Sequence, residues 1–239
     1  MSIDFALVHK QFPAVAEYVS GIYILQRDYG QVSNRRLAAW TGVSGSAVTQ
    51  ALTRLKRLGL AVHKRYEDIG LTPEGRALAV QVLRRHYLLE HLLVRILGYP
   101  WDRADDEAKL LQSEISDDLA EHLYQKLGAP QTCPHGNPMP GSSVEQMLLS
   151  APRLSGAPVG ATVEILRITE EGEQLPSMLA FCYGHGLQPG ARFEVVDRDE
   201  RGLRLTDACR PQDGKNGVVP LSLERAEHVR YQSVPGGRR

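Results

Sequence analysis

The sequence predicts an α+β protein with several domains. Helical spacing of apolar residues fills the first half of the chain, alternating strand patterns fill its last third, and a stretch rich in Ser, Gly and Pro separates the two. With 239 residues, the chain is longer than one average domain. We expect a winged helix-turn-helix at 1–73, a helical domain at 74–141, a linker at 142–157 and a small β-barrel at 158–239.

The N-terminal domain has the pattern of a helix followed by a helix-turn-helix. Apolar residues between 13 and 30 recur with a helical period, and residues 35–55 form two short helical patterns hinged at 41–44. Small hydroxyl and glycine residues open the second of these helices, which caps it and suits close approach to DNA. The side chains that point away from its apolar face are Thr49, Gln50 and Arg54.

A pair of short strands and a long helix come next. Residues 60–65 and 69–71 have the pattern of the two-stranded wing of a winged helix. Thr72 is placed to cap the following helix, with Pro73 in its first turn, and apolar spacing carries that helix to about Leu97.

The formal net charge is zero, but charge is segregated along the chain. Residues 31–65 contain seven basic and no acidic residues, whereas residues 102–121 contain eight acidic and two basic residues. The first segment suits phosphates and the second suits cations; a solvated helix face is the alternative for each. The seven basic residues are Arg35, Arg36, Arg54, Lys56, Arg57, Lys64 and Arg65.

Two ionisable residues, His86 and Glu90, interrupt the apolar stripe of the long helix one turn apart. Their burial is unfavourable unless each is paired, and a divalent cation would satisfy both together. The alternative is a buried hydrogen-bonded His–Glu pair.

The remaining patterns are one helix, an ordered loop and the barrel. Residues 105–127 are expected to form a single amphipathic helix that can contribute to a dimer interface, and the loop at 128–140 carries Cys133 and His135. One helix is expected within the barrel domain, at 175–183. The five expected strands are 162–168, 192–197, 202–206, 218–221 and 228–231.

Several classes of protein are excluded. Three cysteines (Cys133, Cys182 and Cys209) without a CxxC pair argue against a disulfide framework or a zinc ribbon. Because no apolar stretch reaches the length of a membrane span and the N-terminus lacks a signal core, we expect a cytoplasmic protein without membrane contact. No nucleophile–base pair, phosphate loop or hydrolase metal motif appears, so neither an enzyme nor a small-molecule substrate is expected.

The order of these parts resembles the diphtheria-toxin-repressor and manganese-transport-regulator family over nearly the whole chain. The loop Cys-Pro-His-Gly-Asn-Pro-Met-Pro-Gly at 133–141 and the phrase Gly-Leu-Gln-Pro-Gly at 186–190 carry the resemblance. It implies a dimerisation domain, an SH3-like barrel, and a homodimeric transcription regulator that binds a palindromic double-stranded DNA operator when Mn(II) or Fe(II) is bound. Repression of metal-uptake genes is the role it implies.

The resemblance implies two metal sites, and this sequence keeps the ligand-type residues of one site much better than those of the other. At the primary site Glu17 matches a ligand position, but Lys109, Gln112 and Ser113 stand where the family has its other ligands, so we expect an eroded site. The ancillary site keeps residues that can ligate, and the loop adds two further candidates, for which ordinary turn residues are the alternative. The ancillary and loop candidates are His86, Glu90, Asp105, Glu170, Glu173, Cys133 and His135.

The donor types and Lys109 decide which metal and which function are expected. Oxygen-rich ligands with one or two imidazoles make Mn(II) the first choice, and a ligating Cys133 shifts the preference toward Zn(II) or Fe(II). Lys109 is expected either to replace a metal beside Glu17 with its own fixed charge or to face solvent. The main expectation is a metal-responsive regulator, and the alternative is a metal-independent regulator of the same fold.

For DNA, the resemblance places two groups of side chains. Those expected at phosphates are Arg35, Arg36 and Arg54, and those expected in the major groove are Ser44, Ser46, Thr49 and Gln50.

Overall fold

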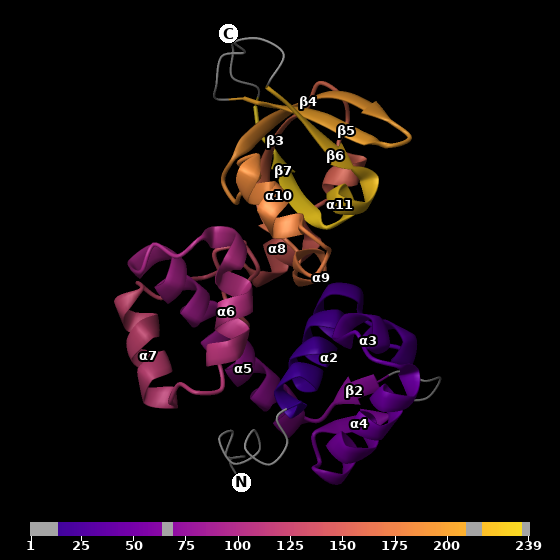
Figure 1. The fold of residues 1–239 in the computed structure, drawn as a ribbon, viewed down its shortest axis with the longest axis vertical. Coiled ribbons are helices and arrows are strands. Elements are labelled where there is room, and N and C mark those ends of the chain that lie inside the picture. Colours follow the sequence, from indigo (N-terminus) through magenta and orange to yellow (C-terminus); the bar gives the residue numbers. More distant parts are fainter. Residues whose placement is uncertain (1–13, 64–68, 209–216, 236–239) are drawn as a thin grey trace. The chain divides into compact units, whose positions relative to one another are not determined.

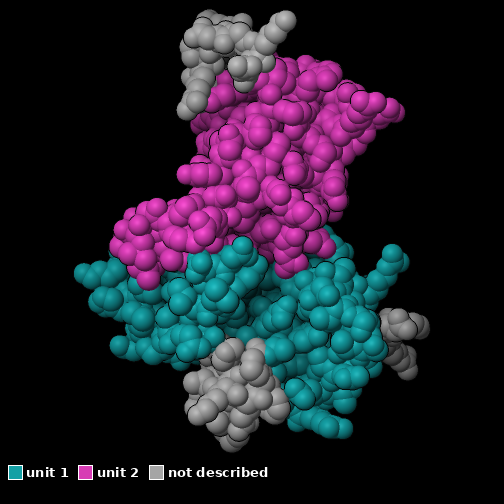
Figure 2. Space-filling model, in the orientation of Figure 1, with its two compact units in different colours: residues 1–89, 106–129 teal, residues 90–105, 130–239 magenta. Residues whose placement is uncertain are grey.

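The computed structural model describes residues 14–63, 69–208 and 217–235, and it divides into two compact units (Figure 2). Unit 1 comprises residues 1–89 and 106–129, and unit 2 comprises residues 90–105 and 130–239. Lys64 and Arg65 of the basic segment, and Cys209, lie outside the described residues. Within the described ranges, no helix combines the length and the apolar character that a membrane crossing requires.

Unit 1 contains the predicted helix-turn-helix and the two strands of a wing (Figure 1). Ser33 and Ser44 begin the two short helices, because each hydroxyl accepts a hydrogen bond from a backbone amide three residues later. Helices α5 and α6 each continue from one unit into the other. The elements are α2 (Val15–Tyr29), α3 (Asn34–Thr41), α4 (Gly45–Arg57), β1 (Ala61–His63), β2 (Ile69–Leu71), α5 (Pro73–His91), α6 (Ala104–Leu111) and α7 (Asp117–Lys126).

The core of the helix-turn-helix is apolar and tightly packed. Leu37 of α3 and Val48 of α4 are fully buried. Trp40 of α3 lies against α2 at Gly21, where a Cβ atom would come within 2.6 Å of the indole nitrogen. Only glycine therefore permits this approach of the tryptophan to α2.

The prediction of one helix over 105–127 is wrong. Helix α6 ends at Leu111 and α7 begins at Asp117, after Ser116 accepts a hydrogen bond from the Leu119 amide. The two acidic residues at the start of α7 favour a new helix N-terminus at that point. Apolar spacing continues across the break, which is why periodicity alone did not reveal it.

The long helix also differs from its prediction near its end. Helix α5 is regular to His91, and the chain then forms a π-helical turn, η2 (Leu92–Ile96). Glu90 consequently lies in the last regular turn of α5, beside an irregular backbone segment of the kind that is frequent at functional sites.

Unit 2 contains a five-stranded antiparallel sheet in the order β6-β5-β4-β3-β7 (Figure 1). Alternate side chains of its strands are fully buried, as at Val163, Ile165 and Val195, and form the core of the domain. The strands are β3 (Thr162–Ile168), β4 (Arg192–Asp199), β5 (Gly202–Asp207), β6 (Val218–Ser222) and β7 (Val229–Ser233).

Unit 2 has more helices than the sequence predicted. The helix expected at 175–183 is α10 (Met178–Gly184), and two further short helices flank the sheet, α9 (Glu170–Glu173) and α11 (Leu223–Glu227). The stretch expected as a linker at 142–157 contains α8 (Glu145–Ser150) and the turn η4 (Leu154–Gly156), and Leu154 is fully buried in the core of this unit.

Candidate metal centre

The loop that carries Cys133 and His135 is a narrow turn held against the sheet. The Cys133 amide donates to the Asn137 carbonyl at 2.8 Å, and the Ile168 amide of β3 donates to the His135 carbonyl at 2.9 Å. Gly136 has a φ of +91°, and a Cβ there would lie 2.2 Å from the Leu166 carbonyl oxygen of β3. A glycine at this position thus allows the turn and its close contact with β3, which fixes where the loop side chains point.

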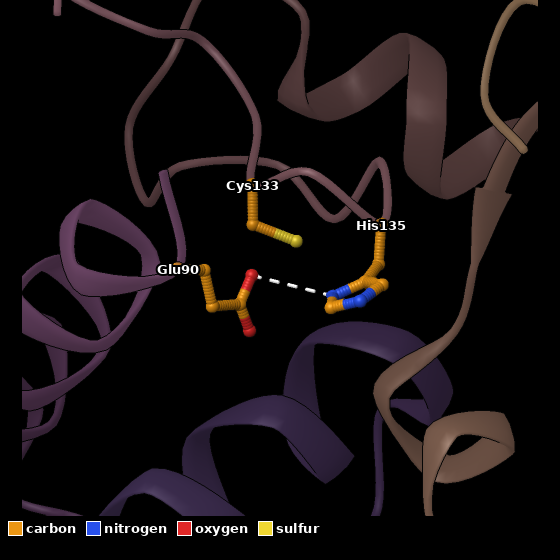
Figure 3. Close-up of side chains that lie close together, drawn as sticks. All are labelled: Glu90, Cys133 and His135. Atoms are coloured by element: carbon orange, nitrogen blue, oxygen red, sulfur yellow. Dashed lines mark ion pairs between the residues drawn. The ribbon is translucent and has the colours of Figure 1, made fainter. Parts of the chain in front are cut away.

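Glu90, Cys133 and His135 converge in unit 2 (Figure 3). One potential ligand atom of each lies within 4.8 Å of the other two, and all three side chains are buried. His135 Nδ1 is 3.3 Å from Glu90 Oε2 and 3.7 Å from Glu173 Oε1. Carboxylate, thiol and imidazole donors at this separation match the donor types of a divalent transition-metal site. We call Glu90, Cys133, His135 and Glu173 the Cys133 cluster.

Helix α9 brings further carboxylates to the same unit. Thr169 caps α9 by accepting a hydrogen bond from the Gly172 amide, and Glu170 and Glu173 lie in the single turn that follows. The Glu173 side chain is 5% exposed, and its Oε1 accepts a hydrogen bond of 2.6 Å from Asn137 Nδ2.

The remaining ancillary candidates lie on α5 and α6. Asp105 is buried, and a carboxylate oxygen of Asp105 lies within 4.8 Å of one of Glu90. His86 is also buried and precedes Glu90 by one turn of α5. Of the seven ancillary and loop candidates, the structure places six in unit 2: Glu90, Asp105, Cys133, His135, Glu170 and Glu173.

Burial of so many acidic groups changes their protonation. Burial raises the pKa of the Glu173 carboxyl well above its ordinary value, and neighbouring carboxylates add to this although His135 opposes it. Burial lowers the pKa of His135, but Glu90 and Glu173 outweigh that effect and raise it to about 9. Burial, followed by the charge of Glu90, raises the pKa of the Cys133 thiol well above its ordinary value. Without a cation the cluster therefore retains protons, and a divalent cation is the partner that would let its donors ionise.

The Glu17 position is different. Glu17 on α2 is exposed. Partial burial of its carboxyl raises the pKa above the ordinary value, although the charge of Lys109 on α6 opposes this shift. Gln112 and Ser113 lie in the turn after α6 and provide no carboxylate or imidazole. In the part of the chain that the structure describes, Glu17 belongs to no group of three metal-ligand side chains whose donor atoms lie within 4.8 Å of one another.

The predicted DNA-contacting side chains lie on α3, on α4 and at the N-cap of α4. Arg36 is half-buried, with its guanidinium 3.4 Å from the centre of the Tyr29 ring. Thr49 Oγ1 accepts a hydrogen bond from Asn34 and donates one to the Gly45 carbonyl, so neighbouring residues hold its side chain in place. The exposed members are Arg35, Ser44, Ser46, Thr49, Gln50 and Arg54.

Three residues that contact the loop at 128–140 (the Cys133 loop) or the Cys133 cluster were not predicted from the sequence. Asn137 binds Glu173, His91 Nε2 is 2.6 Å from the Thr132 carbonyl, and Trp101 makes two hydrogen bonds to the loop. For Asn137, its position two residues after His135 was the sequence feature that could have indicated a role beside the cluster. Trp101 and His91 gave none, because their contacts join segments that are far apart in the sequence.

Comparison with known proteins identifies the domains. Residues 13–69 match the family model "Iron dependent repressor, N-terminal DNA binding domain", and residues 72–141 match "Iron dependent repressor, metal binding and dimerisation domain". Together they cover the helix-turn-helix, the wing strand β1, α5 to α7 and the loop at 128–140, and residues 70–71 of β2 fall between them.

Curated relatives and a solved structure agree with these matches. The chain is 36% identical over 226 residues to the diphtheria toxin repressor of Corynebacterium efficiens, covering 92% of this chain and 95% of that protein. It is 32% identical over 198 residues to the iron-dependent repressor IdeR of Mycobacterium tuberculosis, covering 79% and 86%. A solved manganese-dependent transcriptional repressor in complex with manganese matches with a TM-score of 0.75 and 31% identity, over 92% of this chain and 100% of that chain. The chain therefore belongs to the iron-dependent repressor family, which includes the diphtheria toxin repressor and IdeR.

Proposed function

We propose that this chain is a metal-responsive transcriptional repressor whose effector cation binds at the Cys133 cluster. The convergence of Glu90, Cys133 and His135 within 4.8 Å, in a buried site, is the observation that carries the proposal. Relatives named as iron-dependent and manganese-dependent repressors support it. A bound divalent cation would supply the positive charge that allows these donors to ionise together.

The ligands proposed are Glu90, Cys133 and His135, with Glu173 as the fourth. Asn137 donates a hydrogen bond to one oxygen of Glu173 and so fixes the orientation of the carboxylate. Asp105 and Glu170 form a second proposed set that shares Glu90 and corresponds to the ancillary site. The family resemblance assigns His86, one turn before Glu90 on α5, to the same site. Because a thiol belongs to the first set, Fe(II) and Zn(II) compete there with Mn(II), which the oxygen-rich second set favours.

The proposed partner is an operator in double-stranded DNA. Helix α4 presents Gln50 and Arg54 to solvent, and glutamine can recognise adenine through two hydrogen bonds in the major groove. Arg35 and Arg54 are proposed to contact phosphates, and Arg36 to do so from its position over Tyr29. A palindromic operator follows from a homodimer, in which each subunit would read one half-site.

A homodimer in the cytoplasm is the proposed state of the protein. The matched family domain is described as a dimerisation domain. Leu110 and Leu111 of α6 and Leu119 of α7 are exposed apolar side chains in unit 1, which a second subunit can cover.

Control by metal follows from where the ligands come from. Glu90 is at the end of α5, Cys133 and His135 lie in the loop that follows α7, and Glu173 is in α9. These side chains meet only when the three segments are in the observed arrangement, so a cation bound by all of them stabilises that arrangement over others. The N-terminal end of α5 directly follows the wing strand β2, which gives the helix a covalent connection to the DNA-binding domain.

The test is to titrate metal-free protein with Mn(II), Fe(II) and Zn(II) while measuring bound metal and affinity for DNA from its own promoter. We expect saturable binding and a parallel rise in DNA affinity. In Cys133→Ser/His135→Ala we expect the ion of the Cys133 cluster and the rise in DNA affinity to be lost. Unchanged DNA affinity at full metal occupancy would contradict the proposed function.

A further inference from the structure

Trp101 contacts the Cys133 loop in three ways. Its indole Nε1–H donates to the Pro134 carbonyl at 3.0 Å, and its own carbonyl lies 3.0 Å from His135 Nε2. Its ring meets the His135 ring edge-on, with 4.4 Å between ring centres and 62° between the planes. Trp101 begins the short helix η3 (Trp101–Arg103), is 7% exposed, and lies far from the loop in the sequence.

The hydrogen bond to the Trp101 carbonyl determines which nitrogen of His135 carries a proton. A carbonyl oxygen only accepts, so Nε2 must be the N–H donor of this pair. The other nitrogen, Nδ1, faces the carboxylates of Glu90 and Glu173 at 3.3 and 3.7 Å. In the neutral ring Nδ1 then holds the lone pair, on the side where the other donors converge.

The indole group of Trp101 adds two contacts to the one that the backbone carbonyl makes. Its N–H binds the loop at Pro134, directly beside His135, and its ring edge limits rotation of the imidazole. The Trp101 side chain and carbonyl thus bind two adjacent residues of the loop, Pro134 and His135. In proteins, such contacts to the non-ligating nitrogen of a histidine orient the ring and tune its affinity for metal.

We propose that Trp101 is a positioning residue of the metal centre, which holds His135 with Nε2 protonated and Nδ1 presented as the ligand atom. The inference rests on the proposed function, because it concerns the same cluster. It adds a residue that touches no metal and a definite choice of ligand nitrogen.

The choice of nitrogen can be tested by NMR on the Zn(II)-loaded, diamagnetic protein. We expect a slowly exchanging Nε2–H signal from His135, coupled to the ring carbons that flank Nε2 and absent in His135→Ala. A His135 ring with a protonated Nδ1 and a metal-bound Nε2 would overturn the inference.

The role of the side chain can be tested with a matched pair of variants. Trp101→Phe removes the indole N–H but keeps an aromatic ring and the carbonyl, and Trp40→Phe makes the same change in α3 of unit 1. We expect Zn(II) to bind about 10-fold more weakly to Trp101→Phe and with unchanged affinity to Trp40→Phe. Urea unfolding of both variants in EDTA separates this effect from general destabilisation, because a purely structural role would lower stability without a further loss of affinity.

Fluorescence provides a second measurement, since the chain has two tryptophans. In Trp40→Phe all tryptophan emission comes from Trp101, and we expect that emission to change with Zn(II) at the stoichiometry of binding. If wild-type protein binds Zn(II) and His135→Ala does not, but Trp101→Phe binds as tightly as wild type, the Trp101 inference alone fails. If His135→Ala binds as tightly as wild type, the proposed metal centre itself fails.

Discussion

The Cys133 cluster and the Glu17 position differ in the burial of their acidic side chains and in the source of the positive charge that can balance them. The cluster gathers carboxylates, a thiol and an imidazole in a buried place, where burial raises the pKa of Glu173 and of Cys133. Glu17 is exposed, and the positive charge that acts on it is that of Lys109, a residue of the chain itself.

The difference teaches how charge can be balanced with or without an ion. A buried set of acidic donors is stable only with protons or a cation, so its state depends on conditions outside the protein. A lysine beside an exposed carboxylate provides a constant charge that no metal concentration alters. Sensitivity to metal should therefore reside in the Cys133 cluster, and the following predictions test that assignment.

Removal of one buried ligand should have the largest effect. We expect Glu90→Gln to weaken Mn(II) and Zn(II) binding by more than about 100-fold, a larger loss than the change of an outer partner gives. The matched control is Glu17→Gln, which makes the same chemical change at the exposed position and should alter affinity less than about 3-fold. Isothermal titration of both variants measures the contrast, and an equal loss in the two would remove the distinction between the sites.

A rise in pH should lower the stability of the metal-free protein. The pKa of His135 is raised from 6.5 to about 9 in the folded state, so its contribution to stability is complete below about pH 6.5 and is lost as the pH rises through about 9. The raised pKa of Glu173 acts in the same direction. The shift of His135 alone corresponds to a fall of roughly 3 kcal/mol in the free energy of unfolding in EDTA over this range.

Chemical denaturation at several pH values measures this slope, and His135→Ala should flatten it. Affinity for Zn(II) should rise over the same range, because metal binding requires protons to leave His135 and Cys133. A metal-free protein that becomes more stable between about pH 6.5 and 9 would show that the cluster does not hold these protons.

The thiol should affect metal preference more than total binding. Cys133→Ser replaces a soft donor with a hard one, so we expect Zn(II) affinity to fall by about 10-fold more than Mn(II) affinity. Competition between the two ions, followed by Mn(II) electron paramagnetic resonance, gives the ratio directly. Cys182→Ser, a change at the other buried free cysteine of the described residues, is the control and should leave the ratio unchanged.

Restoration of an acidic residue at the Glu17 position should have the smallest effect. Lys109→Glu places a second carboxylate near Glu17, and we expect it to add one weakly bound Mn(II) per subunit without altering binding at the Cys133 cluster. Metal stoichiometry by equilibrium dialysis distinguishes the two. If the variant binds no additional ion, the idea that one lysine replaced a metal at this position loses its support.

Local patterns in the sequence determined much of the fold. Helical periodicity located α2 and most of α5, capping serines and a glycine turn located the helix-turn-helix, and alternation located all five strands of the sheet to within a few residues. The break at Ser116 was missed because apolar spacing continues across it. The short helices α9 and α11 were missed because one turn of helix leaves too short a pattern to detect. The sequence also supplied every donor of the cluster by residue type, with the family resemblance selecting among them.

Only the tertiary structure decided which of these donors meet and how each is oriented. Glu90 belongs to α5, Cys133 to the loop after α7 and Glu173 to α9, so their encounter depends on the packing of the loop against β3 at Gly136. The nitrogen that His135 presents depends on the carbonyl of Trp101, a contact with no signature in either local sequence. Residue types and helical or strand spacing are local properties of a chain, whereas a ligand set is a property of contacts between distant segments, and those exist only after folding.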